Sequence, residues 1–551
     1  MRPRTLAAVL GAWALATAVL CAGVHHAFAL EPGRDAFPPA RVLASVWAHG
    51  ERLDRALVAR AGETVPSFEP ALRTEGATVR YEALLGEGPA PAFDDVLLAF
   101  SLAPGRDGLA ATIGGRTEYA TPDDLLARQA YRYGVCLPLV DLRVGVDVPL
   151  VQLMLAERFG VSVPVLRERA SFRRVRFARS TSPVDAPARP TPEAALDSAL
   201  AAARYLARGI DARGRFRFRV DGATNHALAG YDWPRHAGAT YFLAQAAARW
   251  HEPELTDATL RAASMLRAQT EVCGTHPCIG DSTLVDLGSS ALATIAFAEI
   301  ALDGIDASYR ADVGNLAAFI RVLQRPDGGF LHQYDRVASR AIDARLLYYS
   351  GEASLALSRA HRLLGDPRDL DAARRGVAHL AGPAWSFFGS RYYFGEEHWT
   401  CEAMADLWDR SPDPQALDFC LRWLGFWRRT QQNATDTPYD ADGGYGVGPV
   451  QVPALTPVAS RCEAGLVTLA VARRAGIAPD ALAPLETQMA RSIALLLRQQ
   501  MRAASPERLG LLADTRAVDG AFPSSEVDWT LRVDFAQHAG SAMLAWLATA
   551  K

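Results

Sequence analysis

The sequence predicts a mainly helical chain in which a ring of six helical hairpins, an (α/α)6 toroid, follows a small α+β domain. Three observations favour this fold class: apolar helices open on a recurring motif, amphipathic helices alternate with them, and glycine-aromatic turns recur along the chain. The motif is clearest at residues 232–247, DWPRHAGATYFLAQAA, where a polar and aromatic cluster precedes a run of small and apolar residues. Such a run predicts a buried helix.

Six helix openings align with one another: RHAGATYFL, VDLGSSALA, YSGEASLAL, WTCEAMADL, SRCEAGLVT and AQHAGSAML. One column of this alignment is polar throughout and holds His236, Asp286, Ser350, Thr400, Arg461 and His538. Two positions later only glycine and glutamate occur, at Gly238, Gly288, Glu352, Glu402, Glu463 and Gly540. The spacings of 50, 64, 50, 61 and 77 residues leave room each time for one helical hairpin and a loop.

Arginine-rich amphipathic helices are expected between these openings, at about 193–209, 256–270, 308–324, 367–381, 414–431 and 480–502. A helix that is apolar all round must be buried, whereas an amphipathic helix can face water on one side. The alternation therefore predicts an inner ring and an outer ring. Four turns of glycine and an aromatic residue, RGRF, PDGGF, ADGGY and VDGAF, follow outer helices.

On these motifs, and on LQRPDGGF in particular, residues 192–551 resemble the six-hairpin glycosidase-like and terpenoid-cyclase-like α/α toroids. The resemblance is one of architecture and includes no family's catalytic motif. It implies that the inner helices all point one way, so that their first turns surround one pole of the ring. The Asp-rich motifs of terpene cyclisation are absent from the predicted ring.

The chain before the ring divides into three predicted parts. Residues 1–29 have a basic start, an apolar stretch and a small-x-small site at Ala27-Phe28-Ala29, which indicates a secretory signal. An uncleaved anchor is the alternative, because about 19 apolar residues can span a bilayer. Residues 30–180 mix strand-like and helical segments and predict the α+β domain, and the proline-rich residues 181–192 predict a linker to the toroid at 193–551.

Export to an oxidising compartment changes how the cysteines are interpreted. In EVCGTHPCIGD, Cys273 and Cys278 are expected to form a disulfide. A zinc site that uses His276 is the alternative, but no second Cys/His pair at ligand spacing accompanies it. Cys401 and Cys462 are expected to be small packing residues rather than nucleophiles.

Charge and composition exclude some functions. The formal net charge of -3 offers no electrostatic case for binding nucleic acid or an anionic membrane, so a membrane is expected to matter only through an uncleaved N-terminal segment. The one lysine, Lys551, is a poor candidate for Schiff-base chemistry. No cofactor is expected. Calcium binding at YDADGGYG lacks the remaining positions of a calcium loop.

The residues that would converge at the inner-helix pole combine carboxylates, imidazoles, phenols and flat aromatics, a combination suited to carbohydrate chemistry. The catalytic candidates are Glu397, Glu402, Asp232, Asp534, His236 and His538. The substrate-binding candidates are Trp233, Arg235, Tyr349, Glu352, Tyr393, Trp399, Arg461, Glu463 and Trp529. Helix capping and the helix dipole are the structural alternative for the polar column and for the three glutamates.

The leading hypothesis is an exported enzyme that acts on a glycan or polysaccharide. In a hydrolase, Glu397 or Glu402 would protonate the leaving oxygen, and Asp232 or Asp534 would activate water. In a uronate lyase or epimerase, a tyrosine (Tyr349 or Tyr393) and a histidine would exchange a proton beside a carboxylate that Arg235 or Arg461 neutralises. Ring closure is expected to make His236 and His538 neighbours. A non-catalytic protein that binds a glycan or peptide is the third hypothesis.

Overall fold

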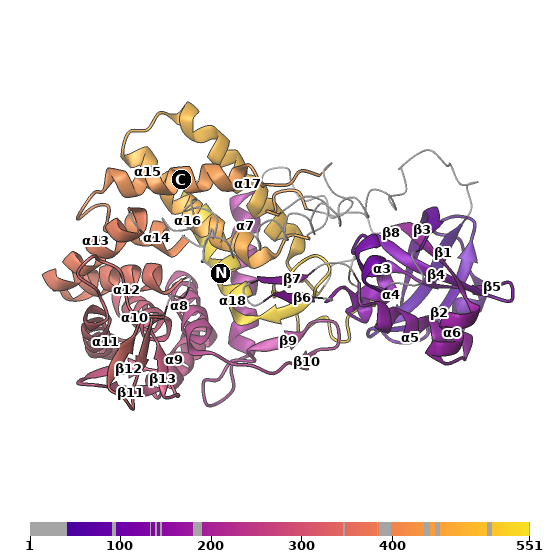
Figure 1. The fold of residues 1–551 in the computed structure, drawn as a ribbon, viewed down its shortest axis with the longest axis horizontal. Coiled ribbons are helices and arrows are strands. Elements are labelled where there is room, and N and C mark those ends of the chain that lie inside the picture. Colours follow the sequence, from indigo (N-terminus) through magenta and orange to yellow (C-terminus); the bar gives the residue numbers. More distant parts are fainter. Residues whose placement is uncertain are drawn as a thin grey trace, which may run out of the picture.

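The structure is a computed structural model that describes residues 41–549, with gaps at 91–94, 133, 138–139, 144–145, 180–189, 345, 347, 383, 385–397, 435–440, 447–451, 504–507 and 509. Two bodies lie side by side, a sheet-containing unit at the N-terminal side of the chain and a larger ring of helices (Figure 1). The predicted signal segment and residues 181–189 of the predicted linker lie outside the described residues. Within them, no single helix is long and apolar enough to cross a membrane, although one bent pair, Val148–Phe159 with Val163–Arg169, passes the same test together.

The first unit is built on a six-stranded antiparallel sheet in the order β2-β1-β3-β8-β4-β5. Its strands are β1 (Val42–Ala48), β2 (Glu51–Val58), β3 (Thr78–Pro89), β4 (Asp107–Ile113), β5 (Arg116–Ala120) and β8 (Ser171–Arg179), and a separate hairpin pairs β6 (Gly134–Leu137) with β7 (Val140–Arg143). The helices of this unit are α2 (Glu69–Leu72), α3 (Asp95–Ser101), α4 (Pro122–Ala127), α5 (Val148–Phe159) and α6 (Val163–Arg169). Strand β1 is buried along its whole length.

The second unit confirms the predicted (α/α)6 toroid. Its inner helices are α8 (Trp233–Trp250), α10 (Leu287–Leu302), α12 (Tyr349–Leu364), α14 (His398–Leu407), α16 (Leu455–Arg474) and α18 (Val533–Thr549). Its outer helices are α7 (Pro192–Arg208), α9 (Pro253–Arg267), α11 (Arg310–Val322), α13 (Pro367–Ala381), α15 (Pro414–Arg428) and α17 (Pro479–Gln499). Each inner helix contacts the next, and α18 contacts α8, so the inner ring closes.

Small residues allow the inner helices to pack closely. Every residue of α10 from Leu287 to Ile300 is buried, and glycines occupy the points of closest approach. A Cβ added at Gly540 would lie 2.1 Å from the ring of Phe242 on α8, and one at Gly288 would lie 2.3 Å from the ring of Tyr349 on α12. The column of glycine and glutamate therefore contains glycine where a neighbouring side chain fills the space.

The glycine-aromatic turns join outer helices to their neighbours. At Gly328 the φ of +91° suits glycine, and an added Cβ would lie 2.3 Å from the carbonyl oxygen of Arg375 in α13. Gln324 donates a 2.8 Å hydrogen bond to the Ala372 carbonyl of the same helix, and Phe330 is buried. The same approach to the carbonyl of an outer helix recurs in the other turns, at Gly214, Gly443 and Gly520.

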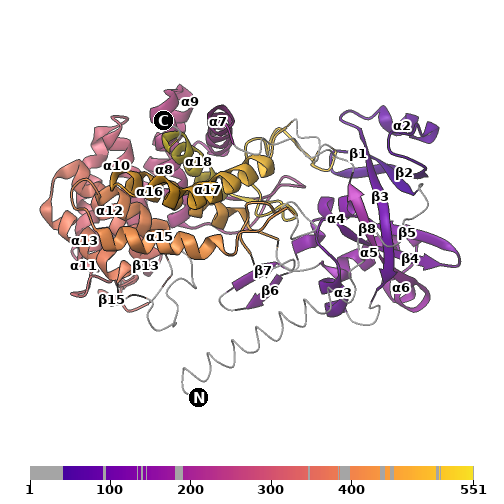
Figure 2. The same ribbon diagram turned by 90° about the horizontal axis from the view of Figure 1, so that it is seen from above.

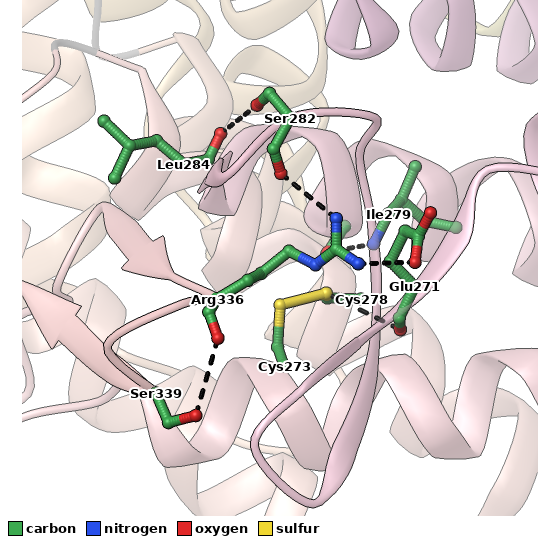
Figure 3. Close-up of a disulfide and its surroundings, with 9 residues drawn as sticks. Glu271, Cys273, Cys278, Ile279, Ser282, Leu284, Arg336 and Ser339 are labelled. Carbon is green, nitrogen blue, oxygen red and sulfur yellow. Dashed lines mark hydrogen bonds and ion pairs between the residues drawn. A yellow bond between two sulfur atoms is a disulfide. The ribbon is translucent and has the colours of Figure 1, made fainter.

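Short strands and two disulfides organise the loops of the ring. Three-stranded sheets join β9 (Arg219–Asp221) to β10 (His226–Ala227) and β16 (Thr530–Arg532), and β14 (Gln333–Asp335) to β13 (Leu284–Asp286) and β15 (Arg340–Ile342). The hairpin of β11 (Thr270–Cys273) and β12 (His276–Ile279) carries the Cys273–Cys278 disulfide expected from the sequence (Figure 3). Arg336 lies beside it and pairs with Glu271 at 2.6 Å.

A second disulfide, which the sequence analysis did not predict, joins Cys401 on inner helix α14 to Cys420 on outer helix α15. Cys401 is therefore a cross-link between the two rings and not simply a small packing residue. Cys462, on inner helix α16, is buried with a free thiol.

One hydrophobic cluster contains residues of both units, which lie next to each other in Figures 1 and 2. The Gly50 amide donates to the Gly510 carbonyl at 2.8 Å, and the Trp529 amide donates to the Gln129 side chain at 2.8 Å. Trp529 and Leu531 pack in the same cluster as Trp47 of strand β1. The segment that leads into α18 is therefore packed against the N-terminal unit.

The turn at Gly328 gives a test of this architecture. Gly328→Ala adds a side chain both at positive φ and against a backbone carbonyl, so we expect it to lower the free energy of unfolding by about 3 kcal/mol or more. Gly365→Ala is the matched control, because Gly365 has a φ of +77° but no atom within 4 Å of an added Cβ. It should cost only about 1 kcal/mol. Equal losses in thermal denaturation of the two variants would contradict the close approach.

Candidate active site

The first turns of the inner helices meet at one pole of the ring, called here the inner-helix pole. The three glutamates of the aligned column, Glu352, Glu402 and Glu463, stand on three consecutive inner helices, α12, α14 and α16. The polar residues of the pole form two groups. One lies on α14, α16 and α18 and is called here the histidine cluster; the other comes from α8, α10 and α12 and is called the acidic half.

The histidine cluster is built around a hydrogen bond of 2.6 Å between Nδ1 of His538 and Glu463. Both side chains are nearly buried, with exposed fractions of 11% for His538 and 3% for Glu463. Burial raises the pKa of Glu463, and the neighbouring His538 opposes that shift. A carboxylate that accepts from Nδ1–H fixes the histidine tautomer, so that the basic lone pair lies on Nε2.

His398 stands next to this pair and was not selected in the sequence analysis. Its ring centroid lies 5.3 Å from that of His538 and 4.8 Å from that of Trp399. The His398 side chain is buried, yet neither of its ring nitrogens has a hydrogen-bond partner among the described residues. Burial, followed by the charges of His538 and Arg461, lowers the pKa of His398 well below its usual value. His398 is thus a neutral imidazole with two unused nitrogens, an arrangement that suits contact with a polar ligand.

Two glutamates at the pole are neutral acids. Burial and the neighbouring Glu463 carboxyl raise the pKa of Glu402 well above its usual value. Burial also raises the pKa of Glu352 well above the ordinary range, and Arg235 opposes that shift without cancelling it. A carboxyl group that stays protonated near neutral pH serves as a hydrogen-bond donor or general acid.

The predicted bases Asp232 and Asp534 are both engaged with arginine. Asp232 caps α8 by accepting from the Arg235 amide at 2.9 Å, and its carboxylate pairs with the Arg235 guanidinium at 2.5 Å. Asp534 pairs with Arg532 at 2.5 Å and with Arg235 at 3.3 Å. Burial would raise the pKa of Asp534, but these arginines outweigh it and lower the pKa. Asp534 is therefore a poor acceptor for a proton from water, and the Asp232 carboxylate is occupied by Arg235.

The predicted pairing of His236 with His538 is not found. His236 is fully buried, its Nδ1 is 2.7 Å from the Tyr231 hydroxyl, and its Nε2 is 2.9 Å from the Ala262 carbonyl on outer helix α9. Its ring thus faces the outer ring rather than α18. Because both nitrogens are occupied, His236 has a structural role, and Trp233 packs beside it in the core, 5.5 Å between ring centroids.

Two other substrate-binding candidates are also used in packing. Trp529 is buried in the core shared with the N-terminal unit, and its indole donates to the Glu526 carbonyl at 2.9 Å, so it offers no face to a sugar. Arg461 lies over the ring of Trp427 on outer helix α15, 3.7 Å from the centroid, which directs its guanidinium toward the outer ring. The predicted roles of Trp529 and Arg461 in contacting substrate are therefore replaced by roles in packing.

The remaining candidates, Tyr349, Glu397, Tyr393 and Trp399, have different outcomes. Tyr349 starts α12, and burial, with Asp286 and Glu352 nearby, raises its pKa far above the usual value, so it acts as a hydrogen-bond donor and not as the phenolate base of a lyase. Glu397 and Tyr393 lie outside the described residues. Trp399 remains at the pole, buried against His398 and His538.

A buried polar core continues along the ring axis from the pole. Arg359 on α12 pairs with Asp406 on α14 at 3.0 Å and also with Glu299 on α10. Tyr241 lies near enough for the charges of Arg359 and Glu402 to act on its pKa, which burial raises well above the usual value. This group was not predicted from the sequence, although three charged residues inside inner helices, Arg359, Glu299 and Asp406, were a usable signal.

His398, Glu463 and His538 have the donor types of a divalent-cation site, and their ligand atoms lie within 4.8 Å of one another. Two features favour proton transfer instead. Glu463 and His538 already satisfy each other at 2.6 Å, and the positive charge of Arg461 acts on His398. A bound cation would add to that positive charge.

No protein-family model and no curated protein sequence matches the chain. Among solved structures, it is similar to a D-mannose isomerase, with 12% identity, 65% of this chain and 97% of that chain covered, and a TM-score of 0.50. It also matches a cellobiose 2-epimerase from Spirochaeta thermophila DSM 6192, with 14% identity, 65% and 95% covered, and a TM-score of 0.47. An unsaturated glucuronyl hydrolase specific for heparin matches with 11% identity, 65% and 97% covered, and a TM-score of 0.46. The chain has the α/α toroid fold of the six-hairpin glycosidase-like proteins.

The structural role of His236 predicts an acid-sensitive fold. Burial lowers the pKa of His236 to about 4, so below its unfolded value near 6.5 the unfolded chain binds a proton that the folded chain does not. Stability is therefore full above pH 6.5 and falls by about 3 kcal/mol as the pH drops through 6.5 toward 4. His236→Gln should lower the melting temperature at neutral pH but flatten its decline with acid. An unchanged decline in thermal denaturation would contradict this role.

Proposed function

We propose that this protein is an exported carbohydrate-active enzyme that interconverts an aldose and its ketose isomer by proton transfer at the histidine cluster. The observation that carries the proposal is the hydrogen bond from His538 to Glu463 beside a buried His398 whose two nitrogens have no partner. A histidine oriented by a carboxylate is a general base, and a neutral imidazole next to it is a ready contact for sugar hydroxyls.

His538 is the base of the proposed reaction. With its Nδ1–H held by Glu463, its Nε2 removes the proton from the carbon next to the carbonyl of the open-chain sugar. The electron pair moves into the carbonyl group and gives an enediolate. The proton then returns from Nε2 to the neighbouring carbon, which completes the transfer on one face of the sugar.

Glu402 is the acid that moves the oxygen protons. Its carboxyl group is neutral because burial and Glu463 raise its pKa, so it donates a proton to the oxygen of the enediolate and gives a neutral enediol. It then receives the proton of the adjacent hydroxyl when the new carbonyl forms. No proton is gained or lost overall, and neither an oxidant nor a reductant takes part.

Isomerisation is favoured over the two predicted reactions for physical reasons. Hydrolysis needs a second carboxylate that activates water, and Asp232 and Asp534 are instead held by Arg235 and Arg532. Epimerisation needs acids and bases on opposite faces of one carbon, whereas the rings of His398 and His538 lie together, 5.3 Å apart. A D-mannose isomerase with the same fold provides a precedent for sugar isomerisation.

Export is part of the proposal. The signal segment predicted at 1–29 would direct the chain to an oxidising compartment, periplasmic or extracellular. The disulfides at Cys273–Cys278 and Cys401–Cys420 support this location, because such bonds persist where thiols are not kept reduced.

The test of the proposal is a panel of aldoses and ketoses incubated in D2O and followed by NMR. We expect interconversion of one pair, with deuterium entering at the carbon next to the carbonyl. His538→Asn should lower kcat/KM at least about 100-fold, because it removes the general base. The control His251→Asn, at the other end of α8 in a left-handed conformation that suits asparagine, should retain full activity. New reducing ends released from a glycan without isomerisation would indicate a hydrolase instead.

Metal removal separates the two uses of the histidine cluster. Because Glu463 and His538 satisfy each other without a cation, we expect dialysis against EDTA to leave the isomerase rate unchanged. The rate should be compared before and after dialysis, and again after addition of Zn²⁺ or Mn²⁺. Loss of activity that one of these ions restores would show that the cluster holds a metal.

A further inference from the structure

The acidic half of the inner-helix pole contains a second buried group without a partner. The side chain of Glu352 on α12 is buried, with the residue 4% exposed, and within the described part of the chain its Oε2 atom has no hydrogen-bond partner. A buried polar atom in this state costs free energy unless a ligand or water completes it. The acidic half therefore has an unused hydrogen-bonding group, as the histidine cluster has in His398.

Glu352 points to the interior of the ring. The charges of Arg235 and Asp232 act on it, although both belong to the start of α8, and α8 and α12 are separated in the ring by α10. On α10 between them, Gly288 lets two side chains of α12 pack against the α10 backbone: an added Cβ would lie 2.7 Å from Oε2 of Glu352 and 2.3 Å from the ring of Tyr349. The starts of the three helices thus form one wall of the pole, with Glu352 and Tyr349 over Gly288.

The arginines in and beside this wall already form ion pairs with carboxylates. Arg235 pairs with Asp232 at 2.5 Å and with Asp534 at 3.3 Å, and Arg532 pairs with Asp534 at 2.5 Å. Asp286, at the start of α10, accepts a 3.0 Å hydrogen bond from the side-chain amide of Gln333. It has no arginine partner in the described residues. The wall therefore has more carboxyl groups than guanidinium groups to balance them.

This composition selects against a negatively charged ligand. A second carboxylate beside Glu352 would be repelled by Asp232 and Asp286, and burial would strengthen the repulsion. Sugar hydroxyls, in contrast, both donate and accept, and so they match a wall that offers a protonated carboxyl, a phenol and carboxylate oxygens.

We propose that the acidic half of the inner-helix pole is the binding site for a neutral saccharide, in which the Glu352 carboxyl group donates a hydrogen bond to a sugar oxygen beside Tyr349. The proposal rests on the proposed function for its ligand class, a sugar, and narrows it by excluding uronates and other acidic sugars. The Arg235 guanidinium then orients Asp232 and Asp534 and does not bind a substrate carboxylate.

The first measurement is equilibrium binding by calorimetry at neutral pH. D-glucose, D-mannose and D-galactose are each compared with the uronic acid of the same configuration. We expect the neutral member of at least one pair to bind about tenfold or more tightly than its uronate, in line with the cost of a mismatched polar group in a buried site. A uronate that binds as tightly as its neutral partner, or binding by no member of the panel, would overturn the proposal.

The second measurement separates a neutral donor from a carboxylate. Glu352→Gln keeps a hydrogen-bond donor of the same shape, so its affinity for the neutral sugar should stay within about fivefold of the parent, whereas Glu352→Ala should lose about tenfold or more. Thermal denaturation of both variants checks that each is folded. Equal losses in the two variants would show that a carboxylate is needed and would overturn the proposed donor.

Binding and turnover distinguish this inference from the proposed function. If neutral sugars bind with the expected pattern but are not isomerised, the result supports the neutral-saccharide site and contradicts the proposed isomerase activity. Isomerisation together with tighter binding of uronates would support the isomerase activity and overturn the neutral-saccharide site. The control His251→Asn, which lies outside both groups of the pole, should bind the neutral sugar as tightly as the parent.

Discussion

The close packing of the six inner helices is the constraint on which the rest of this structure depends. Where α8 meets α18, a single added Cβ at Gly540 would collide with Phe242, and α10 is buried from Leu287 to Ile300. Helices this close admit few polar side chains along their length, because an unpaired buried group is costly. Polar residues therefore gather in the first turns, where the helices meet the loops. The inner-helix pole is a consequence of how the ring is packed.

The same packing decides the charge states of the pole. Low solvent access raises the pKa of the Glu352 and Glu402 carboxyl groups and lowers the pKa of the His398 imidazole, so each is held in its neutral form. Charge persists where a partner is in contact, as between Asp534 and its arginines. Neutral donors and acceptors next to fixed ion pairs suit a polyhydroxyl ligand better than an ionic one. Chemistry and specificity at this pole both follow from burial.

The N-terminal unit contributes to the pole through its packing. It buries Trp529 and holds Gly510, both in the segment that leads into α18, the helix of Asp534 and His538. Strand β16 of this segment pairs with β9, which precedes α8, so the start of α8 and the start of α18 are tied together. The sheet unit therefore supports the part of the ring where the first and last hairpins close.

The sequence by itself determined the ring: the alternation of apolar and amphipathic helices, the glycine-aromatic turns and the column of glutamates predicted six hairpins and one polar pole. These patterns are local, because each depends on the periodicity of a single helix or turn. The partners of the polar residues were decided only by the tertiary structure. The rotation of each helix about its axis turned His236 toward Ala262 on α9 and His538 toward Glu463 on α16. The rotation of α14 likewise brings Cys401 into contact with Cys420 on the neighbouring outer helix. Such contacts join different helices, and a shift of one residue, about 100° of helix rotation, is enough to change them.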